Sequence, residues 1–161
     1  MARPRLSTQD LLAGLEEPGL ETLYAGRVLA LRTRRVELPG RLGRARIQKT
    51  LLGYEVQIGP VRKGCPDEPT ARYLTLFASL GLPEIRLPYN PVETHDLLPA
   101  LEAAFGGIGR AAAAAAGRAG RPDLRRHYER RLCRLLAARI RVIDAAAQNP
   151  GPAAVRPSSQ T

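Results

Sequence analysis

An alternation of side chains with a period of two, between residues 52 and 58, limits the possible folds of this chain more than any other feature. One side of the extended chain carries the apolar residues Leu52, Tyr54, Val56 and Ile58. Glycine and polar residues occupy the other side, and this alternation predicts a half-buried strand. Because the parity changes between residues 49 and 52, we expect Gly53 to mark a bulge or a tight hairpin within the segment 44–60.

The neighbouring segments predict that residues 21–106 form an α+β domain. The expected elements are strands at 27–38, 44–60 and 83–88, a loop at 60–69, and helices at 70–80 and 90–106. We interpret the parity change at the polar residues 32–35 as a bulge or a break in the first strand. Asn90 followed by Pro91 is a specific signal for a helix start. This order favours a small sheet, made of a hairpin and a third strand, with two helices on one face.

The rest of the chain is expected to add one long helix to this domain. The predicted segments are an N-terminal helical segment at 1–20, an Ala/Gly/Arg linker at 107–121, a C-terminal helix at 122–149 and a disordered tail at 150–161. The linker prediction rests on six successive alanines bracketed by glycines, which offer no large apolar side chain to bury. The C-terminal helix is basic and amphipathic. Its apolar stripe includes Leu124, Tyr128, Leu132, Leu135 and Ile140, while Arg125, Arg126, Arg130, Arg134 and Arg141 lie on its other faces.

Positive charge is concentrated in one part of the chain. The formal net charge is +10, and residues 27–63 contain ten Arg or Lys residues against two acids. Such a concentration favours an anionic partner, with nucleic acid first among them. We predict non-enzymatic binding of DNA or RNA by a basic hairpin face that consists of Arg32, Arg34, Arg35, Arg44, Arg46 and Lys49. GC-rich codon usage is an alternative explanation for part of the excess, because arginine outnumbers lysine by 23 to 2.

The C-terminal helix supplies a hypothesis from another functional class. Its apolar stripe has the size that an ordinary helix uses to pack on its own domain or to dimerise. A protein–protein adaptor or assembly factor that dimerises through Leu124, Tyr128, Leu132, Leu135 and Ile140 is therefore the leading alternative.

The scarcity of cysteine and histidine argues against a disulfide framework, a metal site or a cofactor. The chain contains only Cys65, Cys133, His95 and His127, which are far apart in the sequence. No apolar run approaches the roughly 20 residues of a membrane-spanning helix. The basic N-terminus is followed by polar residues instead of a signal-peptide core, so we expect a cytoplasmic protein.

Cys65 is the best candidate for a nucleophile. It precedes a predicted helix start and follows Arg62 and Lys63, and both features can lower the pKa of a thiol. A base would have to come from the distant pair His95 and Asp96. Six residues separate Cys65 from Arg72, where a phosphatase-type loop needs five. A structural role for the thiol is therefore the favoured interpretation.

Glu55 and Gln57 on a predicted strand, with Glu37 on the strand before, suggest a third class. Their order, followed by a helix and another strand, resembles the layout of the PD-(D/E)xK nuclease superfamily. The resemblance covers residues 37–87 and implies a metal ion held by the two carboxylates. Gln57 stands where that family has its lysine. Alternating polar residues on a solvated strand face explain Glu55 and Gln57 equally well, so this hypothesis ranks after binding and adaptor functions.

Overall fold

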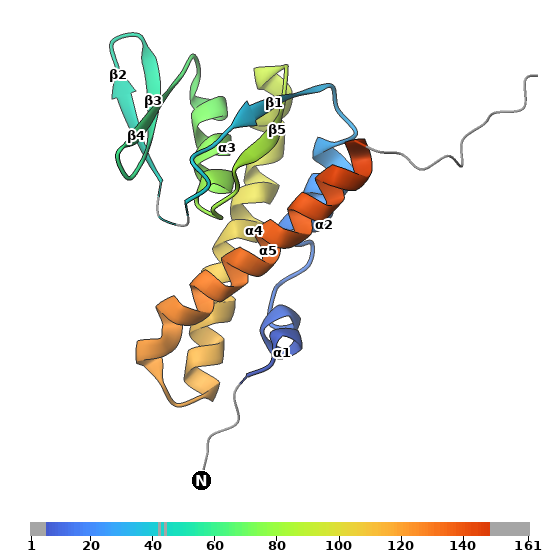
Figure 1. The fold of residues 1–161 in the computed structure, drawn as a ribbon, viewed down its shortest axis with the longest axis vertical. Coiled ribbons are helices and arrows are strands. Elements are labelled where there is room, and N and C mark those ends of the chain that lie inside the picture. The colour runs from blue at the N-terminus through green and yellow to red at the C-terminus, as the bar shows by residue number, and fades with distance from the viewer. Residues whose placement is uncertain (1–5, 42, 44, 149–161) are drawn as a thin grey trace, which may run out of the picture.

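A computed structural model of the chain describes residues 6–41, 43 and 45–148 and shows an α+β fold (Figure 1). The first half contains the helices α1 (Thr8–Ala13) and α2 (Leu20–Leu23), a π-helical turn η1 (Tyr24–Val28), and the strands β1 (Thr33–Glu37), β2 (Arg46–Thr50), β3 (Gly53–Ile58) and β4 (Val61–Cys65). The second half contains α3 (Glu68–Ala78), β5 (Glu84–Pro88), α4 (Pro91–Arg118), a 3-10 turn η2 (Pro122–Leu124) and α5 (Arg125–Gln148). The predicted fold class is confirmed.

The strands form two antiparallel sheets within the described residues, where the sequence predicted one. In the first sheet the order is β2-β3-β4, and in the second β1 pairs with β5 so that Val36 lies opposite Ile85. The parity change at residues 32–35 is not a bulge. It marks the passage from the helical turn η1, which buries Tyr24 and Val28 four residues apart, into β1.

The segment 60–69 is not simply a loop, because its first residues form β4. The turn between β3 and β4 is short, and Ile58 pairs with Val61. β4 has a single buried residue, Cys65, so its own side chains show no alternation. Its strand conformation comes from the backbone pairing with β3.

The β2-β3-β4 sheet has one apolar and one polar face. Val56 and Ile58 of β3 are buried on the face that packs on α3. Arg46, Gln57 and Arg62 lie side by side on the opposite face, since they are register partners across the three strands. The period-two alternation of residues 54–58 is therefore confirmed, and Leu51 and Leu52 form the tip of the β2–β3 hairpin.

We expect Gly53→Ala to lower the free energy of unfolding by about 1–3 kcal/mol. Gly53 has a φ of +140°, and a Cβ atom at this position would lie 2.7 Å from the carbonyl oxygen of Cys65. Urea denaturation measures the change. Gly64→Ala in β4 is the matched control, because open space surrounds its Cβ position. Equal stability of the two variants would contradict the role of Gly53.

Helix α4 begins as predicted, but it continues through the segment that the sequence assigned to a linker. The side chain of Asn90 caps its first turn by accepting a hydrogen bond from the Val92 amide, and Pro91 is its first residue. The linker prediction is wrong from residue 107 to Arg118 because alanine favours helix. The buried alanines of the run, Ala111, Ala112, Ala115 and Ala116, form a smooth helix surface in the core.

Helices α4 and α5 lie side by side as a long helical hairpin (Figure 1). The apolar stripe of α5 is used inside the chain, where Tyr128, Leu132 and Ile140 are buried in the core. Dimerisation through this stripe would thus require α5 to leave α4, and the adaptor hypothesis stays a prediction. Among the described residues, no helix combines the length and the hydropathy needed to cross a membrane.

Candidate functional site

Four arginines follow one side of α5 along most of its length. This arginine row consists of Arg126, Arg130, Arg134 and Arg141. With 3.6 residues per turn they fall within an arc of about 80°, and they span about 22 Å of the helix axis. All four side chains are exposed. The row thus presents a line of positive charge to the solvent.

The arginine row has no counterion within the described part of the chain. Elsewhere arginines have carboxylate partners, as in the ion pairs Arg110–Glu16 and Arg121–Asp123. No ion pair or side-chain hydrogen bond within the described ranges includes a member of the row. Like charges four residues apart on a helix destabilise it by a few tenths of a kcal/mol. A bound polyanion would relieve this repulsion.

A groove of about 720 Å³ lies beside the first half of α5. Its walls include Ala45 just before β2, Ile47 of β2, Leu76 of α3, Phe105 of α4, and Arg126 and Arg130 of the arginine row. Arg72 and Glu102 also line the groove and form an ion pair with each other. The groove therefore joins an apolar floor to a basic rim, and one of its walls is the edge strand β2.

The residues predicted to form a basic hairpin face do not share one surface. Arg46 and Lys49 are exposed on β2, on opposite faces of the β2-β3-β4 sheet. Arg34 and Arg35 lie on β1 in the other sheet and also point to opposite faces. Arg44 lies outside the described residues. The expected hairpin between the two basic segments is wrong, because β1 pairs with β5 and β2 pairs with β3.

Two of the predicted binding residues already have partners within the chain. Arg35 forms an ion pair with Glu84 at 3.2 Å, and the guanidinium carbon of Arg32 lies 5.0 Å from the centre of the Tyr89 ring. Sequence reasoning placed the α5 arginines on the helix but did not identify them as a site. Their spacing of four, four and seven residues was a visible signal.

Cys65 does not have the environment of a nucleophile. Its side chain is buried, and this burial raises the pKa of the thiol against the opposing effect of Lys63. The nearby Asp67 caps helix α3, because its carboxylate accepts a hydrogen bond from the Thr70 amide. The structural interpretation of Cys65 is thus the better one.

The acids of the nuclease-like pattern lie in separate sheets. Glu37 is on β1, opposite Glu84, whereas Glu55 is on β3. Gln57 donates a hydrogen bond to the side-chain oxygen of Gln48 at 3.1 Å. In the part of the chain that the structure describes, no group of three or more His, Cys, Asp or Glu side chains is placed to hold a metal ion. The resemblance does not extend to a shared carboxylate site.

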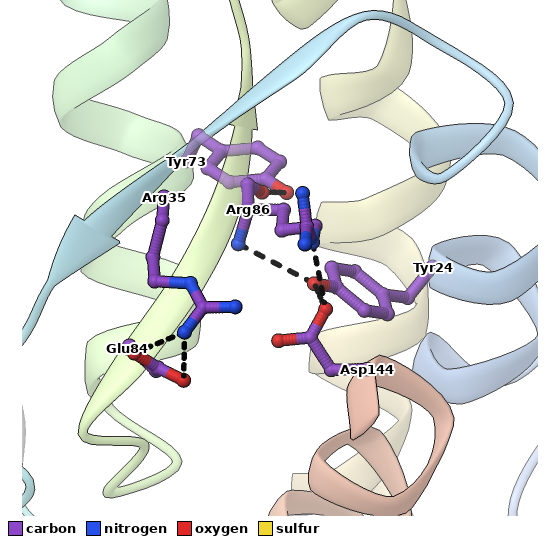
Figure 2. Close-up of polar contacts among 6 residues, drawn as sticks. All are labelled: Tyr24, Arg35, Tyr73, Glu84, Arg86 and Asp144. Atoms are coloured by element: carbon purple, nitrogen blue, oxygen red, sulfur yellow. Dashed lines mark hydrogen bonds and ion pairs between the residues drawn. The ribbon is translucent and has the colours of Figure 1, made fainter. Parts of the chain in front are cut away.

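A buried polar network ties the end of α5 to β5 and η1 (Figure 2). The Tyr24 hydroxyl and the Arg86 Nε both donate hydrogen bonds to Oδ1 of Asp144, at 3.0 and 3.1 Å. The Arg86 amide donates to the Tyr24 hydroxyl, and the Tyr73 hydroxyl donates to the Arg86 carbonyl oxygen. Burial raises the pKa of both tyrosines far above the usual range. These groups hold elements together and are unsuited to proton transfer near neutral pH.

A second cavity, of about 500 Å³, lies beside this network. Glu84 and Asp144 line it, but Arg35 and Arg86 already engage these two carboxylates.

No family model matches this chain, and comparisons with curated proteins and with solved structures give no match either. The arginine row is therefore the feature whose chemistry points most directly to a ligand.

Proposed function

We propose that this protein binds nucleic acid without catalysis, through the arginine row of α5. The observation that carries this proposal is a set of four exposed arginines on one side of a helix, none of them paired with a carboxylate of the described residues. Guanidinium groups are suited to phosphate because their planar fork donates two parallel hydrogen bonds. Members of the row four residues apart are separated by about 6 Å along the axis, so each can meet a different phosphate.

The chemistry of the row favours contacts with the phosphate backbone over readout of base sequence. Arginines that meet phosphates fix the position of a nucleic acid but carry no sequence information by themselves. Such binding weakens as salt increases, because each neutralised phosphate releases condensed counterions. We therefore expect affinity for both duplex and single strand, with little dependence on sequence.

The salt dependence of binding tests the proposal quantitatively. If all four arginines meet phosphates, log Kobs against log salt should have a slope of about −3.6 for duplex DNA and about −2.8 for a single strand. Arg130→Gln should reduce the slope on duplex by about 0.9 and weaken binding at low salt. Fluorescence anisotropy with labelled oligonucleotides measures both quantities.

Two control variants separate the row from general basicity. Arg121→Gln removes an exposed positive charge that Asp123 already engages, so it should leave the slope nearly unchanged. The double variant Arg46→Gln/Lys49→Gln tests the strand surface expected from the sequence. A slope that responds to this double variant and not to Arg130→Gln would place the binding surface on β2 and refute the role of the row.

A further inference from the structure

Strand β2 is an open edge of its sheet, and its residue Ile47 lines the groove. All five of its residues are exposed, and among the described strands its backbone pairs on one side only, with β3. Exposed edge strands are usually blunted by proline, a bulge or short length. β2 contains no proline and pairs with β3 without interruption over five residues. Its free edge is thus a regular template for another strand.

We propose that two copies of this chain associate through their β2 strands, which pair antiparallel around a twofold axis at Gln48. The two three-stranded sheets then become one sheet of six strands. In this register Gln48 lies opposite Gln48 of the second copy, Arg46 lies opposite Thr50, and Ile47 lies opposite Lys49. No like charges face each other directly, so the strand is complementary to itself.

The same pairing covers the groove. An added strand beside β2 continues the sheet over the groove, whose lining includes Leu76 of α3 and Phe105 of α4. The relative exposure of Ile47 is 39%, and Ile47 lies on the same sheet face as the buried Val56, so in the dimer it faces this apolar floor. Each copy thereby fills the groove of the other.

The exposed tip of the β2–β3 hairpin is an argument that a second copy of the chain occupies the groove. Leu51 and Leu52 have relative exposures of 104% and 98%. Antiparallel pairing at Gln48 brings this tip alongside the 43–45 end of the other copy, which lines the groove with Gly43 and Ala45. The proposed register thus places two fully exposed leucines of one copy beside the apolar groove of the other.

Lys49 is the one residue of β2 that argues against strand addition, because an inward-facing charge usually protects an edge. Its side chain lies on the same sheet face as Tyr54. The groove contains Glu129, for which the described part of the chain shows no ion pair. In the dimer this carboxylate is the acidic group available to Lys49 of the second copy, and it lies beside Arg126 and Arg130 of the basic rim.

Sedimentation equilibrium of the full chain tests the association. The expected result is a dimer that dissociates on dilution. Ile47→Lys places two additional like-charge pairs in the interface and should raise the dimer Kd by about tenfold or more. Val142→Lys, on the exposed side of α5, is the matched control and should leave the Kd unchanged. A monomer at every concentration, or a dimer equally sensitive to both variants, overturns the proposal.

A disulfide crosslink tests the register. Paired residues in antiparallel strands have Cα atoms about 4.5–5.5 Å apart, within the range that a disulfide bridges. Gln48→Cys should therefore crosslink to its own copy under mild oxidation, whereas Thr50→Cys should not. The native Cys65 and Cys133 are buried, and the unsubstituted chain provides the background. A dimer in which Thr50→Cys crosslinks and Gln48→Cys does not overturns the register.

The crosslinking experiment also distinguishes the dimer from other occupants of the groove and from the proposed binding of nucleic acid by the arginine row. Excess oligonucleotide added before oxidation should still allow the Gln48→Cys crosslink to form, since Arg134 and Arg141 of the arginine row lie outside the groove. Failure of the crosslink to form when nucleic acid is present before oxidation would instead assign the β2 edge to the nucleic acid and overturn the dimer. Failure of Arg130→Gln to alter the salt slope would bear on the proposed function alone.

Discussion

Asp144→Ala should lower the free energy of unfolding by about 3–5 kcal/mol, the usual cost of removing one member of a buried ion pair. Asp144 is 7% exposed, and its Oδ1 accepts hydrogen bonds from Tyr24 and Arg86. The alanine variant leaves a fully buried phenol without its acceptor and a largely buried guanidinium without its counterion. Because these groups belong to η1 and β5, the substitution also loosens the end of α5.

Urea denaturation at neutral pH measures this loss, and two further variants identify its cause. Asp144→Asn keeps an oxygen acceptor but removes the charge, so its loss should be smaller than that of the alanine variant. Asp123→Ala breaks the Arg121–Asp123 ion pair, whose side chains are 51% and 61% exposed. An exposed pair of this kind contributes little to stability, because solvent screens its charges. Similar losses for Asp144→Ala and Asp123→Ala would contradict a stabilising role for the buried network.

Local signals in the sequence predicted those elements that depend on neighbours along the chain. Asn90 and Pro91 mark the start of α4 because capping and the fixed φ of proline act within one turn. The alternation at Tyr54, Val56 and Ile58 reports one buried face of a strand. These features arise wherever such residues occur in this order, so no tertiary information is needed to find them.

The errors fall where a partner distant in the sequence decides the structure. Residues 61–65 become β4 through pairing with β3, although their side chains show no alternation. The alanine run becomes part of α4 because its small side chains are buried in the core that includes α5. Composition alone could not distinguish a linker from a helix that packs closely against another.

The candidate site was only partly predictable for the same reason. The sequence shows every arginine but not which of them has a counterion. Arg35 and Glu84 are 49 residues apart, and Tyr24 and Asp144 are 120 apart. Only the fold shows that Arg35 is paired, whereas the arginine row has no ion pair within the described residues. The sequence shows only that positive charge is concentrated in residues 27–63. The structure shows which of the described arginines have no carboxylate partner.

Stability should fall steeply as the pH rises above about 9, by about 5 kcal/mol at pH 11. Burial raises the pKa of Cys133 from 9.0 to about 11 and raises those of Tyr24 and Tyr73 above the usual value of 10. In the folded state these groups keep their protons, while in the unfolded state they lose them. The unfolded state therefore binds fewer protons in this range, and each such group costs about 1.4 kcal/mol per pH unit.

Because the chain has few lysines, this alkaline loss of stability comes from the buried phenols and the two buried thiols. Arginine stays charged at pH 11, and the chain contains only two lysines, so its ion pairs persist where a lysine-rich protein would lose them. Urea denaturation between pH 8 and pH 11 should show the decline. Cys133→Ala should reduce the part that begins near pH 9, to which the buried Cys65 also contributes, and Tyr24→Phe should flatten the part above pH 10. Equal free energies of unfolding at pH 8 and pH 11 would show that these side chains ionise as readily in the folded chain as in the unfolded one.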